Sequence, residues 1–432
     1  TISMSQDVQG EAFDYPEIFF EEKIHEIRRI HPDPREIEKA AEKIKKSQQP
    51  IIIAGGGILY SEAENELSEF AKKHNIPVTP TVMGIGCMDK DDPYYIGAIG
   101  CLGEGSSNSL SKDTDMAIAV GTKLSDFTTG SWTNFQNSEF KLVSINTARF
   151  DVTKHRAEPV ISDAKIGLRE LSKILGDWKA PDNWIQRAKK EKNDWDAYVE
   201  KESGPTNQEI PSYAQAVGAI YRNADQSDIV VSAAGGLVGE LVQIWKPKQL
   251  NTFETEWGFS CMGYEISGGL GIKMAKPDQE VIVFIGDGSY LLHNSDIYSS
   301  ILYDKKLIIV VCDNGGHMVI NRLQLAKGGK EYLCNLRSAR AKNLEFVNFE
   351  AHAKSMGANA ETVKSTSELE SAFKRAKESD KTYVISIETH GYQWLEGTSF
   401  WESPTLEVHT TEENKKAYSD FIDGKKKQRK GV

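Results

Sequence analysis

Three short runs of almost uninterrupted apolar residues constrain the fold more than any other feature of this sequence. They are Val281–Ile285, Leu307–Cys312 and Tyr383–Glu388. Runs of this length are typical of strands, and a strand that is apolar on both faces must be covered by helices on both faces. The segments between the runs favour helices, so this half of the chain is predicted to form a parallel α/β sheet.

The first half of the chain repeats the alternation. Ile51–Ala54, Pro77–Val82 and Met116–Val120 have the composition of buried strands. Asp33 followed by Pro34 marks the start of the first amphipathic helix. We therefore expect a second parallel α/β domain in this half.

A triple glycine, Gly55-Gly56-Gly57, follows the first of these strands. Glycines at this position can cradle a nucleotide, but the GxGxxG spacing is missing. The pattern favours a plain tight turn and leaves nucleotide binding open.

A chain of 432 residues exceeds what one core usually organises. The fold class is therefore predicted as α/β, with two doubly wound parallel-sheet domains. The predicted organisation is a linker packed along other domains (1–32), a central Rossmann-like domain (33–178), a helical connection (179–204), a second α/β domain (205–400) and a C-terminal tail (401–432).

Composition excludes several classes of protein. The net charge of −11 disfavours binding to nucleic acid, and no apolar run approaches the roughly 18 residues that a membrane span needs. The one basic cluster, Lys425–Lys430, is expected to be a frayed, solvated end. Five widely spaced cysteines without a CxxC pair indicate neither a disulfide framework nor a zinc site, and they favour the cytoplasm.

Polar clusters follow two of the apolar runs. Gly286-Asp287-Gly288-Ser289 comes directly after the first, and Asp313-Asn314-Gly315-Gly316 after the second. The carboxyl ends of neighbouring parallel strands meet at one ligand crevice, so Asp287 and Asn314 are predicted to share one ion. Hard oxygen ligands suit Mg²⁺ or Ca²⁺, and the glycines let backbone N–H groups approach a phosphate.

The order of strand, GDGS, helix, strand and DN resembles the signature of thiamine diphosphate enzymes, which begins with GDG and ends with NN. The resemblance implies thiamine diphosphate and Mg²⁺ as cofactors. It also implies Asp287 and the Asn314 side chain as metal ligands, with the carbonyl of Gly316 as a third. Asp313 replaces the first Asn of the signature, a position that does not carry the ligand.

Two further segments resemble the same family. In AAGGLVGE, the residues Ala234, Gly235, Gly236 and Leu237 resemble the loop that wraps the diphosphate, with a simple strand-to-helix turn as the alternative. In FSCMG, Met262 stands where a bulky apolar side chain props the cofactor, with core packing as the alternative. The carbonyl of Ser260 is implied as the acceptor for the 4′-amino group.

The subfamily is suggested by EWGFSCMGYEISGGLG, GDGSYLLHNSD and INRLQ, which resemble the hydrolases of inositol catabolism. Those enzymes open the ring of trihydroxycyclohexane-1,2-dione, a small cyclic substrate, to give 5-deoxy-glucuronate. His317 departs from the aromatic residue expected at its position. It is either a proton-transfer group or a solvated, loop-packing histidine, and the same alternatives hold for His293.

The resemblance also implies a homodimer or homotetramer, and a catalytic glutamate on a pyrimidine-binding domain that would precede Thr1. Without that domain the chain alone is expected to be inactive. The alternatives are an acetolactate synthase-like carboligase or 2-oxo acid decarboxylase, and a non-catalytic nucleotide-binding fragment.

Overall fold

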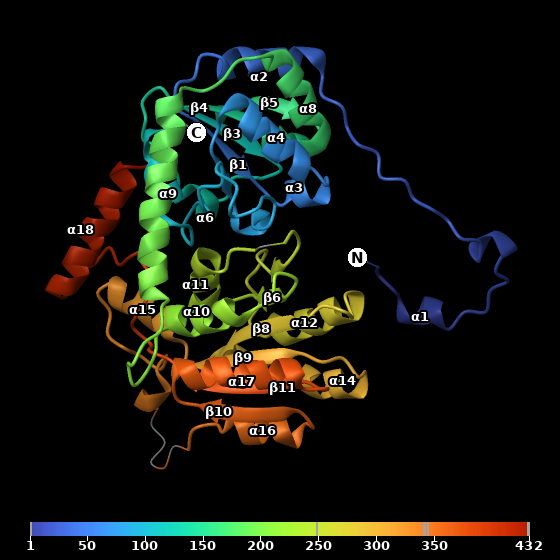
Figure 1. Ribbon diagram of the computed structural model, residues 1–432, viewed down its shortest axis with the longest axis vertical. Helices are drawn as coiled ribbons and strands as arrows, with labels where there is room; N and C mark the ends of the chain where they lie inside the picture. The colour runs from blue at the N-terminus through green and yellow to red at the C-terminus, as the bar shows by residue number, and fades with distance from the viewer. Residues whose placement is uncertain (1, 248, 340–342, 344, 430–432) are drawn as a thin grey trace.

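In a computed structural model, two parallel sheets lie at opposite ends of an elongated molecule (Figure 1). The structure describes residues 2–247, 249–339, 343 and 345–429. Both sheets have helices on their two faces, and every strand pairing between named strands is parallel. This confirms the predicted fold class.

The central domain contains a sheet of order β2-β1-β3-β4-β5. Its strands are β1 (Pro50–Ala54), β2 (Val78–Pro80), β3 (Met116–Val120), β4 (Lys141–Asn146) and β5 (Glu158–Ile161). Its helices are α2 (Pro34–Ile44), α3 (Gly57–Tyr60), α4 (Glu64–His74), α5 (Gly105–Asp113), α6 (Asp126–Thr129), α7 (Arg149–Val152) and α8 (Ala164–Leu175), with 3₁₀ turns η2 (Val82–Gly84) and η3 (Lys154–Arg156).

The second domain contains a sheet of order β10-β11-β9-β8-β6-β7. Its strands are β6 (Ile229–Ser232), β7 (Phe253–Thr255), β8 (Val281–Gly286), β9 (Ile308–Asp313), β10 (Asn359–Val363) and β11 (Tyr383–Glu388). Its helices are α10 (Tyr213–Asn223), α11 (Gly236–Ile244), α12 (Tyr264–Ala275), α13 (Asp287–Leu292), α14 (Asp296–Leu302), α15 (Met318–Ala326), α16 (Phe349–Ser355) and α17 (Thr366–Glu378), with η4 (Leu336–Ser338). The strand order reverses between β6 and β8, which marks the crevice where open sheets of this kind bind ligands.

The triple glycine serves close packing. The amide of Gly57 donates to the carbonyl of Gly121 at 3.0 Å, and a Cβ on Gly55 would lie only 2.2 Å from that same oxygen. The backbone after β1 therefore packs directly against the backbone after β3, with no room for a side chain between them.

The connection between the domains is α9 (Asp182–Glu202), which runs along both of them in Figure 1. Lys192 of α9 and Lys246 of the second domain both pair with Asp196. Their ammonium groups also lie 4.0 and 3.9 Å from the fully buried carboxylate of Glu104, in the central domain. One charge cluster thus joins the two domains through α9.

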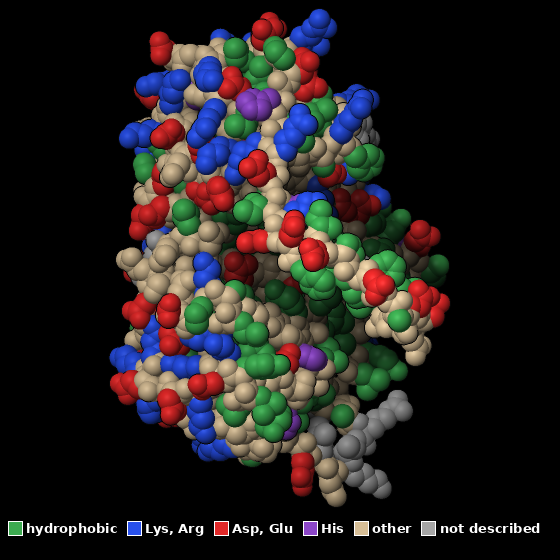
Figure 2. Space-filling view, turned by 90° about the vertical axis from the view of Figure 1, so that its right-hand side faces the viewer, with side chains coloured by type: hydrophobic (Ala, Val, Ile, Leu, Met, Phe, Trp, Pro, Cys, Tyr) green, Lys and Arg blue, Asp and Glu red, His purple; other side chains and the backbone are tan. Residues whose placement is uncertain are grey.

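The N-terminal segment differs from its prediction. Residues 2–28, which contain α1 (Gln6–Gln9) and η1 (Glu17–Phe19), are exposed and leave the body of the molecule (Figure 1). Figure 2 looks onto this side, where hydrophobic side chains of the segment and of the second domain face the solvent. The expected packing is not seen against the two described domains, and aromatic rings of the segment contact one another, as Tyr15 and Phe19 do at 5.1 Å between centroids. Packing along other domains stays a prediction.

The C-terminal segment also differs from its prediction, since it contains a helix, α18 (Glu412–Lys426). The side chain of Gln428 donates to the carbonyl of Ser131 at 3.0 Å, and the backbone N–H of Arg429 donates to Trp132 at 3.0 Å. A frayed end is therefore wrong for the described part of Lys425–Lys430, because carbonyls of the central domain accept these hydrogen bonds. Lys430 lies outside the described residues.

Candidate active site

A pocket of about 220 Å³ opens at the carboxyl ends of β6, β8 and β9, on both sides of the strand-order reversal. Each candidate residue of the sequence analysis lines it except His293. Those residues are Ala234, Gly235, Gly236, Leu237, Ser260, Met262, Gly286, Asp287, Gly288, Ser289, Asn314, Gly316 and His317. Four loops that lie far apart in the sequence therefore converge, while the roles given to their residues stay predictions.

The Asn314 side-chain amide, the Gly316 carbonyl and Asp287 Oδ1 lie close together in this pocket. The Asn314 amide, placed so that its nitrogen donates to the Tyr213 hydroxyl at 2.6 Å, turns its oxygen toward Gly316 and Asp287. The site that this oxygen occupies is 2.8 Å from the Gly316 carbonyl and 3.3 Å from Asp287 Oδ1. With the amide reversed, its nitrogen would donate to both oxygens instead. In the first orientation no hydrogen-bond donor of the described residues lies between the oxygens of Asn314, Gly316 and Asp287. A cation that prefers oxygen ligands would fit between them.

Asp287 supplies the charge at this point. It is the first residue of α13, it is 2% exposed, and its Oδ2 atom has no hydrogen-bond partner among the described residues. Burial, with a smaller contribution from Asp313, raises the pKa of Asp287 to about 7. A buried carboxylate with a free oxygen is costly without a cation, so this side chain also fits a metal ligand.

Gly316 requires its glycine. Its φ is +141°, and a Cβ there would lie 2.2 Å from the carbonyl oxygen of Cys334. Only glycine adopts this backbone without strain, and the backbone conformation aims the Gly316 carbonyl at the Asn314 amide.

The glycine loop after β6 forms another wall of the pocket. Gly235 has φ +81°, and α11 starts at Gly236 with no side-chain cap on its first amides. Free N–H groups at a helix start favour an anion such as a phosphate. A Cβ on Gly236 would lie 2.0 Å from the ring of Trp394, so the loop also depends on close packing.

The FSCMG loop is shaped by Glu256, whose carboxylate accepts hydrogen bonds from the N–H groups of Phe259 (2.9 Å) and Cys261 (2.7 Å). Ser260 between them has φ +51°, a left-handed conformation. Met262 is 39% exposed, so the structure does not bury it in a core, and its Cε atom reaches within 3.5 Å of the place where a Gly288 Cβ would stand. Its side chain is free to support a ligand.

The two histidines lie in different surroundings. The His317 ring borders Gly288, where a Cβ would come within 2.8 Å of it, and it lines the pocket. His293 does not line the pocket, and its Nε2 lies 3.2 Å from Asp296 Oδ2. The geometry therefore keeps His317 as a candidate and gives His293 a partner outside the pocket.

Sequence reasoning missed two residues. Tyr213 stands beside Ser212, the N-cap of α10, which forms a capping box with Gln215. No sequence signal indicated that the Tyr213 hydroxyl reaches Asn314. Glu265 is a charged residue in a mostly apolar helix, and this exception to the pattern could have identified it from the sequence.

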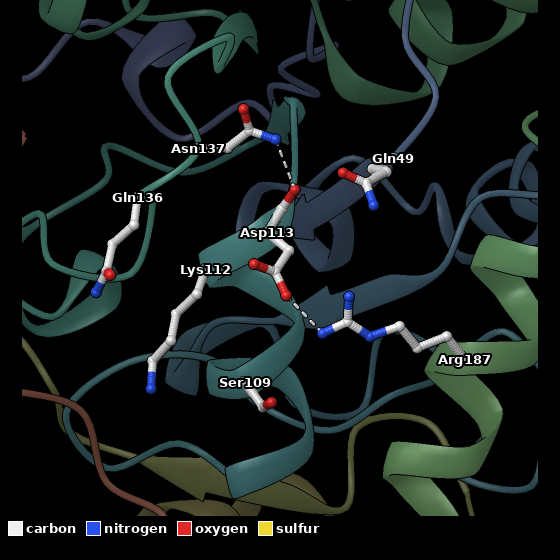
Figure 3. A pocket seen from close by; sticks show the side chains of 7 residues that line it. All are labelled: Gln49, Ser109, Lys112, Asp113, Gln136, Asn137 and Arg187. Carbon is white, nitrogen blue, oxygen red and sulfur yellow. Dashed lines mark hydrogen bonds and ion pairs between the residues drawn. The ribbon is translucent and has the colours of Figure 1, made fainter.

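A larger hollow of about 580 Å³ lies in the central domain (Figure 3). Its polar groups bond to one another: Arg187 pairs with the Asp113 carboxylate at 2.6 Å, and Asn137 donates to the Asp113 carbonyl at 2.8 Å. None of the predicted motif residues lines it. The smaller pocket is therefore the better candidate for the active site.

Two family models match the chain. The central domain of thiamine pyrophosphate (thiamine diphosphate) enzymes matches residues 37–171, and their C-terminal TPP-binding domain matches residues 233–387. The second match spans the four loops that line the pocket.

Relatives with a shared name extend the match over the whole chain. A 3D-(3,5/4)-trihydroxycyclohexane-1,2-dione hydrolase of Clostridium tetani is 34% identical over 466 residues, covering 100% of this chain and 72% of the relative. Proteins of the same name from Halalkalibacterium halodurans and Geobacillus thermodenitrificans are 35% and 33% identical, covering 97% and 100% of this chain and 69% and 71% of those relatives. The converging loops, the family models and these relatives agree, and the chain belongs to the thiamine pyrophosphate enzymes.

Proposed function

We propose that this protein is a thiamine diphosphate- and Mg²⁺-dependent hydrolase that opens the ring of trihydroxycyclohexane-1,2-dione to give 5-deoxy-glucuronate. The observation that carries the proposal is the convergence of the four loops on one pocket in a chain whose relatives share that substrate in their names. In the overall reaction, water adds across the bond between two neighbouring carbonyl carbons. One carbon becomes a carboxylic acid and the other an aldehyde, so no oxidant or reductant is needed.

In this proposal Asp287, Asn314 and the Gly316 carbonyl hold Mg²⁺. Their support is the closeness of the Asn314 amide, the Gly316 carbonyl and Asp287 Oδ1, together with the unpartnered Asp287 Oδ2. The start of α11 and the glycine loop before it bind the diphosphate, supported by their uncapped amides. A bound Mg²⁺ would offset the negative charges of Asp287 and of the diphosphate.

When bound, thiamine diphosphate would supply a nucleophilic carbon that adds to a carbonyl group, and a cationic ring that takes up the electrons of the carbon–carbon bond being broken. The chain's own residues orient and protect that chemistry. Met262 supports the bend of the cofactor, and the Ser260 carbonyl accepts from its amino group. Met318, Val319 and Ile320, which line the pocket, keep bulk water away from the reacting carbons. His317 at the pocket wall holds or delivers a proton.

The proposal includes a homo-oligomer in the cytoplasm. Its support is apolar surface next to the pocket: Phe259 and Leu292 are 92% and 62% exposed, on the FSCMG loop and at the end of α13. Five free cysteines suit a reducing compartment. No helix in the described ranges is long and apolar enough to cross a membrane.

The test is a product analysis of the full gene product with thiamine diphosphate and Mg²⁺. Incubation with the cyclic dione in H₂¹⁸O should give an open-chain acid that carries one ¹⁸O in its new carboxylate. Incubation with pyruvate should release no CO₂ and no acetolactate. Rapid decarboxylation or carboligation of pyruvate without ring opening would replace the hydrolase by the carboligase or decarboxylase alternative.

A further inference from the structure

One buried carboxylate touches three of the loops that form the pocket. Glu265, the second residue of α12, is 1% exposed. Its Oε2 accepts the N–H of Gly263 at 2.8 Å, next to Met262, and its Oε1 faces the N–H of Ala234 at 3.5 Å, in the glycine loop. Burial raises the pKa of Glu265, and the Ser289 side chain, in the GDGS turn, is close enough to oppose that effect as a hydrogen-bonding neighbour.

No cation within the described ranges forms an ion pair with Glu265, so its charge is held by hydrogen bonds alone. A buried carboxylate in this position needs every donor it has, since an unmet lone pair would cost free energy. The three donors are fixed in space by the carboxylate that they share. Each of them also belongs to a segment with a proposed contact to a different part of the cofactor.

A glutamate that only packs in the core would not need to contact three separate loops, as Glu265 does. Another glutamate of the same domain, Glu240, is also buried, at 3% exposed, and its carboxylate accepts one backbone N–H, from Leu395 at 3.0 Å. Glu240 does not line the pocket and bonds none of the loops that do. Among the described residues of this domain two glutamates are thus buried, but only Glu265 connects the loops.

We propose that Glu265 is a positioning residue that sets the spacing between the glycine loop, the FSCMG loop and the GDGS turn, and so makes them bind the cofactor as one unit. The proposal rests on the proposed roles of those loops. Glu265 does not touch the cofactor in this arrangement, and it acts through the backbone N–H groups and the hydroxyl that it holds.

The carboxylate is required because all of its partners are donors. In Glu265→Gln, one acceptor oxygen becomes an amide that confronts either the Ala234 N–H or the Gly263 N–H with another donor. The loops then separate by a small amount, and the cofactor must reorder them as it binds. The dissociation constant for thiamine diphosphate, measured by calorimetry with Mg²⁺, should rise by about tenfold to a hundredfold.

Two comparisons separate positioning from a general loss of stability. Glu240→Gln removes a matched buried charge and should leave the dissociation constant within about twofold of the wild type. In a double-mutant cycle, Ser289→Ala should weaken binding in the wild type and much less in Glu265→Gln, because the two residues act together. Urea unfolding of each variant shows that the folded protein is being compared.

Amide exchange of the wild-type protein without cofactor gives a test that needs no variant. The N–H groups of Ala234 and Gly263 should both be protected, although both belong to loops. The proposal is overturned if these amides exchange freely, if Glu265→Gln binds like the wild type, or if Glu240→Gln weakens binding equally. If the wild-type protein itself fails to bind thiamine diphosphate with Mg²⁺, the proposed function fails instead.

Discussion

The hydroxyl of Tyr213 lies 2.6 Å from the side-chain nitrogen of Asn314, a residue 101 positions further along the chain. The contact ties the first turn of α10 to the end of β9 and places the Asn314 amide beside Gly316 and Asp287. Because Tyr213 is buried, no water substitutes easily for its hydroxyl.

Tyr213→Phe should therefore weaken the metal site while keeping its shape. Loss of one buried hydrogen bond leaves the Asn314 amide less firmly placed, and the apparent Mg²⁺ affinity should fall by about threefold to tenfold. A titration of thiamine diphosphate binding against Mg²⁺ measures this. Tyr290→Phe is the control, because that buried hydroxyl bonds His352 outside the pocket. Equal effects of the two variants would argue against a specific role for Tyr213.

Asp287→Ala should abolish Mg²⁺-dependent binding of thiamine diphosphate. It removes the anionic ligand of the proposed site, a loss of several kcal/mol on the scale of a broken charged network. Calorimetry with and without Mg²⁺ is the measurement. Asp296→Ala in α14 is the control, since that carboxylate pairs with His293. Unchanged affinity in Asp287→Ala would remove this residue from the metal site.

Met262→Ala should separate binding from turnover. The side chain is proposed to shape the bend of the cofactor and not to anchor its charge, so the dissociation constant should stay within about tenfold while kcat falls more. Equilibrium binding and steady-state rates of the full gene product give the two numbers. A parallel fall of both would assign Met262 to packing.

Glu240→Gln should change how stability depends on pH. Burial raises the pKa of Glu240 to about 7, from its ordinary value of 4.5. Since the folded pKa is the higher one, the stabilising contribution is complete below about pH 4.5 and is lost as the pH rises through about 7. The glutamine variant carries no such charge, so it should be more stable than the wild type by about 1 to 3 kcal/mol at pH 8 and nearly equal at pH 5. Urea unfolding at the two pH values checks this, and an equal difference at both would contradict it.

The pocket could be predicted from sequence because each of its loops follows or precedes an element with a strong local pattern. Val281–Ile285 and Leu307–Cys312 are apolar enough to be recognised as buried strands, and parallel pairing then brings Asp287 and Asn314 to the same edge. The arrangement of oxygen atoms around Asn314 depends on side-chain rotamers and could not be predicted.

Other features depend on contacts between distant segments, which local patterns do not encode. A run of lysines indicates solvent, yet α18 packs closely against the Phe400 ring at Gly424, where a Cβ would lie 2.2 Å from that ring. The bridge from Glu265 to Ala234 likewise joins residues that are 31 positions apart. In both cases the local sequence does not indicate which distant residue the segment contacts.

The route of the chain after β11 has a mechanical consequence. The chain returns to the central domain, where Asn108 donates to the Gly397 carbonyl at 2.8 Å and Gln428 reaches Ser131. The domains are therefore joined twice, once by α9 and once by this returning segment. A single connection would allow one sheet to rotate against the other, whereas two connections at separate places restrict that rotation. All residues that line the pocket belong to the second domain, so the shape of the pocket does not depend on the angle between the two domains.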